Sequence, residues 1–123
     1  MNIKFTEVGP DFLTATMPVV DHTMQPFGIL HGGASCALAE TVGSAAGALC
    51  VDLKNELCVG LEIDVNHLKM VSSGFVKATA FPIHIGKKTH VWEIKIYAIE
   101  EKKEKLCAIS RLTLMVIEKR PSS

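Results

Sequence analysis

Alternating apolar and polar residues predict that most of this chain forms antiparallel β-strands around one long helix. The clearest alternation runs from residue 61 to residue 66, where odd positions are apolar and even positions are acidic or amide side chains. Runs rich in β-branched residues, bounded by glycine-containing turns, indicate further strands. The predicted strands cover residues 3–8, 12–17, 60–68, 75–85, 91–99 and 106–117, and the predicted helix covers residues 33–51.

The order of these elements predicts an α+β fold, because a single helix must pack on an antiparallel sheet. Two strands form a hairpin around Gly9-Pro10-Asp11, the helix follows, and four strands then form a meander. The lysines and glutamates of residues 100–105 are interpreted as a solvated hairpin turn. The 123 residues contain no repeat, low-complexity block or linker. We therefore expect a single domain over residues 1–123, with 118–123 as a loose polar tail.

The helix is unusual because Glu40 is the only charged residue between Gly32 and Val51. A membrane span is disfavoured, since a carboxylate at mid-bilayer costs about 2.5–3.5 kcal/mol and half of the stretch is alanine or glycine. A helical projection separates a bulky apolar stripe from a face of small residues that carries Glu40. The stripe consists of Leu38, Val42, Ala45 and Leu49, and the opposite face consists of Cys36, Glu40, Gly43, Ser44 and Gly47. This pattern predicts a helix buried on both sides, with Glu40 where a second backbone or a ligand approaches.

Glu40 is therefore the leading candidate for chemistry. A buried carboxylate usually pairs with a cation, but the only arginines, Arg111 and Arg120, are distant in sequence. Burial without a cation raises the pKa of a carboxyl group, which suits acid–base work. The glycines that precede the helix, Gly32 and Gly33, would leave backbone N–H groups at its positive end, where they can hold an oxyanion.

Other catalytic motifs are incomplete or missing. The segment 33–37 lacks the last glycine of a nucleophile elbow, and the chain has no phosphate-binding glycine loop. No metal-ligand spacing of His, Cys or Glu occurs, so no metal is expected. His84 and His90 flank the turn at Gly86 and are expected at the surface. His67 is the last residue on the apolar face of the strand predicted over residues 60–68. It either packs as part of the pocket wall or takes part in the functional site.

Composition narrows the function further. Lys+Arg and Asp+Glu balance at 13 each, so the chain lacks the basic excess that nucleic-acid binding needs. Hydrophobic residues make up 48%, and the mean hydropathy is +0.28, which suggests that a partner subunit covers apolar surface. Charged residues near the N-terminus interrupt the apolar stretch that a secretory signal peptide would need, so no signal peptide is expected. We expect a cytoplasmic protein with four reduced and mostly buried thiols, Cys36, Cys50, Cys58 and Cys107.

The motifs around the helix start resemble those of the hotdog-fold acyl-CoA thioesterases. The resemblance covers residues 26–35 and continues through Ala39-Glu40-Thr41, and the specific combination is His31-Gly32-Gly33 with a glutamate nine residues after the histidine. It extends through residues 59–63, 66–67, 84–87 and 92–94. The group resembled contains the 1,4-dihydroxy-2-naphthoyl-CoA, 4-hydroxybenzoyl-CoA (Arthrobacter-type) and phenylacetate-pathway thioesterases. It implies one long central helix wrapped by a curved antiparallel sheet.

The resemblance also implies catalytic roles for five residues. Gln25 would bind and polarise the thioester, with His31 in the same loop, and the Gly32 N–H would face the thioester oxygen. Glu40 of the opposite subunit would act as nucleophile or general base. Ser44, one helical turn beyond it, would assist the attacking group or water.

A second set of residues is implied in binding the substrate. Gly33 would lie beside the thioester, His67 near the pantetheine or acyl region, and Lys69 and Lys87 near the CoA phosphates. One departure concerns this set, since Leu68-Lys69-Met70 stands where relatives often carry Arg-Pro after the histidine.

The expected reaction is hydrolysis of an aryl- or medium-chain acyl-CoA, with coenzyme A as part of the substrate and no further cofactor. The resemblance implies a homodimer that joins two sheets edge to edge and holds two active sites, and usually a tetramer of two dimers. Two alternatives remain: a hotdog acyl-CoA hydratase or dehydratase, and a non-catalytic acyl-CoA-binding protein. The sequence leaves open whether the thiol carrier is CoA or an acyl carrier protein.

Overall fold

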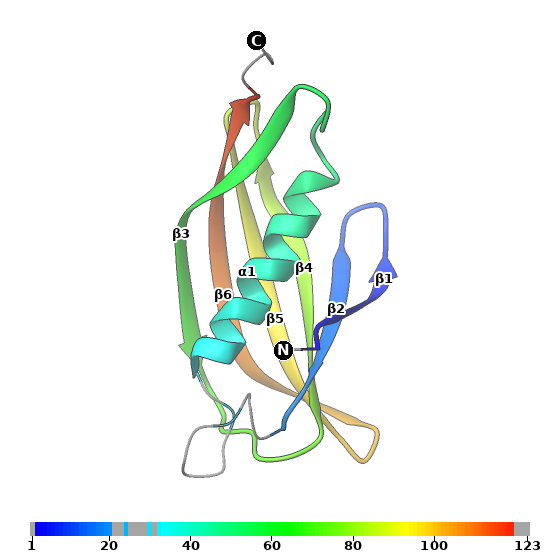
Figure 1. Ribbon diagram of the computed structural model, residues 1–123. Coiled ribbons are helices and arrows are strands. Elements are labelled where there is room, and N and C mark those ends of the chain that lie inside the picture. The colour runs from blue at the N-terminus through cyan, green and yellow to red at the C-terminus, as the bar shows by residue number, and fades with distance from the viewer. Residues whose placement is uncertain (1, 21–23, 25–29, 31, 120–123) are drawn as a thin grey trace.

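The structure is a computed structural model that describes residues 2–20, 24, 30 and 32–119. In chain order, its elements are β1 (Lys4–Val8), β2 (Leu13–Pro18), α1 (Gly32–Ala48), β3 (Glu56–His67), β4 (Phe75–Ile85), β5 (Thr89–Glu100) and β6 (Lys103–Glu118). The strands form one antiparallel sheet in the order β1-β2-β4-β5-β6-β3, and α1 lies across one face of it (Figure 1). The predicted α+β architecture is therefore confirmed.

The predicted four-strand meander is wrong in one respect, which is the position of β3. The strands β4, β5 and β6 form a meander, but β3 pairs with β6 over its whole length, from Glu56 opposite Glu118 to His67 opposite Ala108. The reason is that both edges of β4 are already occupied, one by β5 and the other by β2. The free edge of β6 is left for β3, and residues 68–74 cross the end of the sheet to reach β4.

The boundaries of several predicted elements also change, and β3 and β6 begin at Glu56 and Lys103 rather than at residues 60 and 106. The helix ends at Ala48, three residues before the predicted end, because the Cys50 N–H bonds the Gly47 oxygen at 3.0 Å and tightens the last turn. The predicted tail begins too early, since Glu118 belongs to β6 and the Lys119 N–H donates to the Asn55 oxygen at 2.7 Å. Residues 120–123 lie outside the described residues.

The helix packs on the sheet through small residues as well as large ones. Leu38 and Val42 are fully buried, as predicted. Gly43 and Gly47 also face the sheet: a Cβ atom would stand 2.5 Å from a Leu112 methyl at Gly43 and 2.5 Å from a Leu114 methyl at Gly47. Glycine at these two positions lets α1 approach β6 closely, because any side chain would displace a buried leucine.

The expectation that the helix is buried on both sides is wrong for the single chain. The sheet covers one side of α1, and the opposite side, which carries Glu40, is exposed. Leu49 of the predicted apolar stripe is also 63% exposed, since it follows the last helical residue. No helix in the described part of the chain is long and apolar enough to cross a membrane.

The cysteines are free, but they are less buried than predicted. Only Cys107 is fully buried, Cys36 and Cys58 are partly buried, and Cys50 is exposed. Burial raises the pKa of the Cys58 and Cys107 thiols, which disfavours the reactive thiolate. This leaves both cysteines without the properties of a nucleophile.

His90 contradicts the prediction that it is a surface residue, because it is only 1% exposed. Its Nδ1 atom accepts a hydrogen bond from the Trp92 indole N–H at 3.4 Å, and the Gly47 backbone packs against the ring. Burial lowers the pKa of His90 and the nearby His84 lowers it further, while Glu56 opposes the shift. Side chains alternate between the two faces of β5, and this alternation points the His90 imidazole into the core. The surface position was predicted because His90 is close in sequence to the turn at Gly86.

We expect His90 to make the protein sensitive to acid. Because the pKa of His90 is lowered on folding, the unfolded chain takes up a proton more readily, and stability falls as pH drops below about 6.5. One such group contributes at most about 1.4 kcal/mol per pH unit to the unfolding free energy. Urea unfolding of a His90→Gln variant between pH 7.5 and 5 should show a shallower pH dependence than wild type. The exposed His67→Gln variant is the control, and parallel pH dependences for wild type and His90→Gln would contradict the prediction.

Candidate active site

A groove of about 570 Å³ lies where the helix begins and β3 ends. The segment after β3 forms one wall, and the start of α1 forms the other. A hydrogen bond of 2.6 Å from the Leu30 N–H to the Val71 oxygen ties Leu30, two residues before the helix, to this segment. The groove is lined by Leu30, Gly32, Ser35, His67, Leu68, Lys69, Met70, Val71 and Cys107.

Gly32 and His67 face each other in this groove. A Cβ atom at Gly32 would stand 3.4 Å from His67 Nε2, so the glycine leaves the histidine ring next to exposed backbone. The first N–H groups of a helix have no acceptor within the helix and carry the positive end of its dipole. The first turn of α1, with Gly32 and Gly33 both exposed, can therefore hold a carbonyl oxygen that develops negative charge.

Glu40 and Ser44 share the exposed side of α1, away from the groove. Glu40 is exposed and Ser44 is partly exposed, one turn further along. Within the described residues the only ion pair joins Lys77 and Glu104, on β4 and β6. Arg111 lies on the outer face of the sheet, in register with Asp64 and Glu93, so the sheet separates it from the helix.

Glu40 cannot serve the groove of its own chain. The two positions are eight residues apart on one straight helix, so Glu40 lies about 12 Å along the axis from Gly32. A nucleophile must come within about 3–3.5 Å of a carbonyl carbon whose oxygen is about 3 Å from the N–H donor. A glutamate side chain does not bridge that separation. A site that used both Gly32 and Glu40 would therefore draw them from two copies of the chain.

The two lysines implied in phosphate binding lie at opposite ends of the sheet. Lys69 lines the groove just beyond β3. Lys87 lies in the turn after β4, next to a different hollow of about 890 Å³ that includes His90. The eleven residues of β4 separate the two ends by about 35 Å. A shared role for Lys69 and Lys87 within one chain has no support from this arrangement, and the role of Lys87 stays a prediction.

The structure thus gathers Gly32, His67 and Lys69 in one groove, and it places Glu40 with Ser44 on a separate face. Gly33 follows Gly32 in α1 but does not line the groove. Gln25 and His31 lie outside the described residues. Sequence reasoning missed the groove residues Ser35 and Cys107, whereas Met70 was expected in the pocket wall. Only strand pairing brings Cys107 to the end of β3, and no local pattern signals that. Within the described ranges, no three His, Cys, Asp or Glu side chains gather as metal ligands would.

Comparison with known proteins gives a consistent result. Residues 27–105 match the family model described as the thioesterase superfamily. The chain is 45% identical to the 1,4-dihydroxy-2-naphthoyl-CoA hydrolase of Escherichia coli K12, over 95% of this chain and 83% of that protein. It is also 45% identical to the proofreading thioesterase EntH of Cronobacter turicensis, over 95% of this chain and 82% of that protein.

Solved structures agree with these relatives. A thioesterase crystal structure from Haemophilus influenzae superposes with a TM-score of 0.87 at 52% identity, and covers 94% of this chain and 78% of its own. A thioesterase from Staphylococcus aureus, solved as a glutamine-to-alanine mutant, has a TM-score of 0.88 at 40% identity and covers 93% of this chain and 92% of its own. The same protein was also solved as a glutamate-to-alanine mutant, and its two mutated positions are 15 residues apart.

Proposed function

The chain belongs to the thioesterase superfamily, and we propose that it hydrolyses aryl- or medium-chain acyl-CoA to the free acid and CoA. The family assignment confirms the hotdog fold and the activity of a thioester hydrolase that the sequence predicted. The acyl-CoA substrate follows the E. coli relative, which is named for hydrolysing a CoA ester of an aromatic acid.

The proposed mechanism divides the work between the first residue of one helix and the middle of the partner subunit's helix. The Gly32 N–H, at the positive helix end, holds the thioester oxygen and stabilises the charge that develops on it. Glu40 of the partner subunit attacks the carbonyl carbon, or removes a proton from the water that does so. If Glu40 attacks, the carbon–sulfur bond breaks to leave an acyl–Glu40 anhydride, and water then hydrolyses the anhydride to the free acid and restores the carboxylate. If Glu40 acts as a base, the carbon–sulfur bond of the tetrahedral intermediate breaks to give the free acid directly. In both routes CoA leaves as the thiolate and takes up the proton released by water. Gln25 and His31 orient the thioester, and Ser44 assists the attacking group.

The spacing of Gln25 and Glu40 supports these roles. The two residues are 15 positions apart, as are the mutated glutamine and glutamate of the S. aureus thioesterase. That protein aligns over nearly its whole length with this chain, so the equal spacing supports an equivalent pair here.

The axial separation of Gly32 and Glu40 is the observation that carries the proposal of a shared site. A shared site of this kind would need a homodimer. The free edge of the sheet is a surface through which two chains could pair. The strand β3 is twelve residues long and lies at the edge of the sheet, where its second edge has no neighbouring strand in the described chain. An unpaired edge favours pairing with another strand. Two copies joined through β3 would form a continuous sheet, and we propose that two such dimers form a tetramer.

The exposed side of α1 suggests why aryl and medium-chain groups both fit. Around Glu40 the exposed and partly exposed helix residues have small or medium-sized side chains: Cys36, Ala37, Thr41, Ser44, Ala45 and Ala48. Small side chains leave space between the helix and a partner subunit for an acyl group. Aromatic residues make up only 6% of the chain, so ring stacking is a weak source of selectivity.

A thiol-release screen tests the proposed function. Aryl-CoA, short-, medium- and long-chain acyl-CoA esters are offered in parallel, and release of free CoA is measured. The proposal expects the highest kcat/KM for aryl or medium-chain esters. Hydration of crotonyl-CoA without thiol release would favour the hydratase alternative, and binding without any turnover would favour a non-catalytic acyl-CoA-binding protein.

A further inference from the structure

The Ser35 hydroxyl lies on the buried side of the groove at the helix start, and the proposed mechanism gives it no role. Ser35 lines this groove although only 4% of the residue is exposed. Within the described residues, no group is hydrogen-bonded to the hydroxyl, and no polar side-chain atom that is sealed from solvent lacks a partner. The hydroxyl oxygen is therefore open to solvent, and the opening beside it is the groove.

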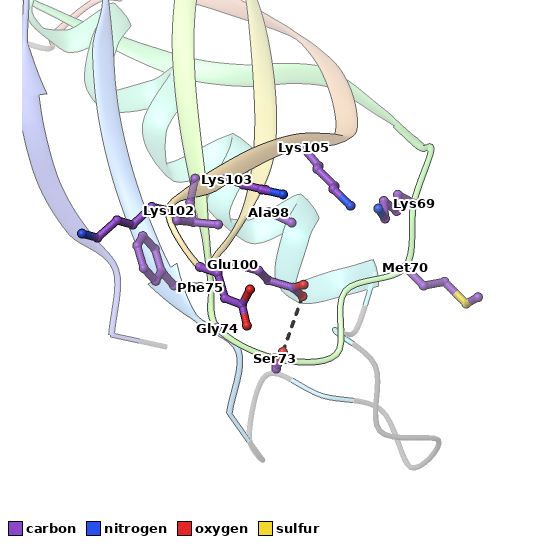
Figure 2. A pocket seen from close by; sticks show the side chains of 12 residues that line it. Lys69, Met70, Ser73, Gly74, Phe75, Ala98, Glu100, Lys102, Lys103 and Lys105 are labelled. Atoms are coloured by element: carbon purple, nitrogen blue, oxygen red, sulfur yellow. Dashed lines mark hydrogen bonds between the residues drawn. The ribbon is translucent and has the colours of Figure 1, made fainter.

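The other polar side chains of the groove are either occupied or lie on its open side. The Cys107 thiol is buried, but it already donates to the Ile96 oxygen at 3.3 Å. The His67 side chain is exposed. Lys69 and Met70 also line a neighbouring hollow of about 660 Å³, and Figure 2 shows the Met70 side chain extending away from it. Ser35 thus offers a free donor on the side of the groove that water reaches least.

The geometry of the helix brings this hydroxyl close to the first backbone N–H groups. Ser35 follows Gly32 by three residues, so the two residues are neighbours on one face of α1. Side chains of an α-helix lean toward its N-terminus, and the Ser35 hydroxyl therefore extends back over the turn that begins at Gly32. Gly32 has no side chain to stand between this hydroxyl and a ligand in the groove. The Gly32 N–H and the Ser35 hydroxyl are two donors on one helical turn.

We propose that the Ser35 hydroxyl is a second hydrogen-bond donor to the thioester oxygen, beside the Gly32 N–H. Each donor stabilises the negative charge that this oxygen gains in the transition state. Burial strengthens the hydrogen bond from Ser35, because little water competes for it. The inference rests on the proposed function, which places the thioester oxygen at the start of α1. Ser35 acts by hydrogen bonding alone, and no bond to its oxygen forms or breaks.

The first test compares Ser35→Ala with Ser110→Ala, which removes another buried serine hydroxyl that does not line the groove. Ser110 donates to the Asp64 oxygen at 2.7 Å, so its variant should have a lower Tm and an unchanged kcat for benzoyl-CoA. Ser35→Ala should show the opposite pattern, because its hydroxyl has no partner to lose in the free protein. Its Tm should be unchanged and its kcat should fall about 10²-fold, with KM within about twofold of wild type.

The second test observes the hydrogen bond directly, through the infrared band of the bound thioester carbonyl. Benzoyl-CoA labelled with ¹³C at the carbonyl is bound to Glu40→Ala, which is expected to bind the ester without turnover. Adding Ser35→Ala to this variant should raise the carbonyl stretching frequency, because the oxygen then accepts one hydrogen bond fewer. Adding Ser35→Cys should raise it nearly as much, since a thiol is a weak donor of similar size. Adding Ser110→Ala should leave the band in place.

Three outcomes would overturn the inference. One is a wild-type kcat in Ser35→Ala, and another is a carbonyl band that does not move when the hydroxyl is removed. The third is a fall in Tm for Ser35→Ala as large as that for Ser110→Ala, since this would assign the hydroxyl a structural role.

Failure of the proposed function gives a different result, because wild type would then release no CoA from any ester. If wild type still binds benzoyl-CoA, the carbonyl band of the bound ester tests the donor without any turnover. An upward shift on adding Ser35→Ala supports the inference in that case, and an unmoved band overturns it. If wild type binds no acyl-CoA ester, both the proposed function and the role of Ser35 are wrong.

Discussion

Glu40→Ala is expected to abolish thioester hydrolysis and to leave binding of the CoA ester intact. Glu40 is the only charged residue of α1, and it lies on the face away from the groove that holds Gly32 and Lys69. Its removal takes away the attacking group or the base, a loss of about 10²–10⁴ in rate, while the contacts that bind CoA remain. Steady-state kcat and equilibrium titration with benzoyl-CoA measure the two effects separately.

Two further variants sharpen this test. Glu40→Gln keeps the size of the side chain but removes the carboxylate, and it should be as inactive as Glu40→Ala. Thr41→Ala changes the neighbouring exposed helix residue and should retain wild-type activity. The assignment of Glu40 fails if the alanine variant keeps more than about a tenth of the wild-type kcat.

The sequence could predict the fold because the relevant signals are local. Alternation and β-branched runs located every strand, and one long stretch of helix-forming residues located α1. The position of β3 could not be predicted in the same way. Neighbouring strands in sequence often pair, but here β2 occupies the edge of β4 that β3 would need, and that competition is a property of the whole sheet.

In the candidate site, too, some features follow from the local sequence and others depend on how the whole sheet is assembled. The residues at the helix start follow from a contiguous motif, but the motif does not predict that Gly32 lies beside His67, as the structure places it. The projection of Glu40 away from the bulky stripe was right, but its burial was not, because the sheet of one chain covers only one side of α1.

Mixing two inactive variants is expected to restore activity, because the proposed active site takes its parts from both subunits. His31→Ala removes a residue of the loop before α1, and Glu40→Ala removes the carboxylate that a partner supplies. A heterodimer of the two variants holds one doubly damaged site and one intact site. After mild dissociation and random reassembly of equal amounts, half of the dimers are heterodimers, so roughly a quarter of wild-type activity should return.

The geometry of the helix makes this outcome diagnostic. If Glu40 served the groove of its own chain, every site in every mixture would lack either His31 or Glu40, and the mixture would stay inactive. The separation of about 12 Å along α1 argues against such a site. The control is a mixture of Glu40→Ala with Glu40→Gln, which should remain inactive because no heterodimer regains a carboxylate. An inactive mixture of His31→Ala and Glu40→Ala, with subunit exchange verified by differential tagging, would refute the shared site and require Glu40 to reach its own groove through a bent or shifted helix.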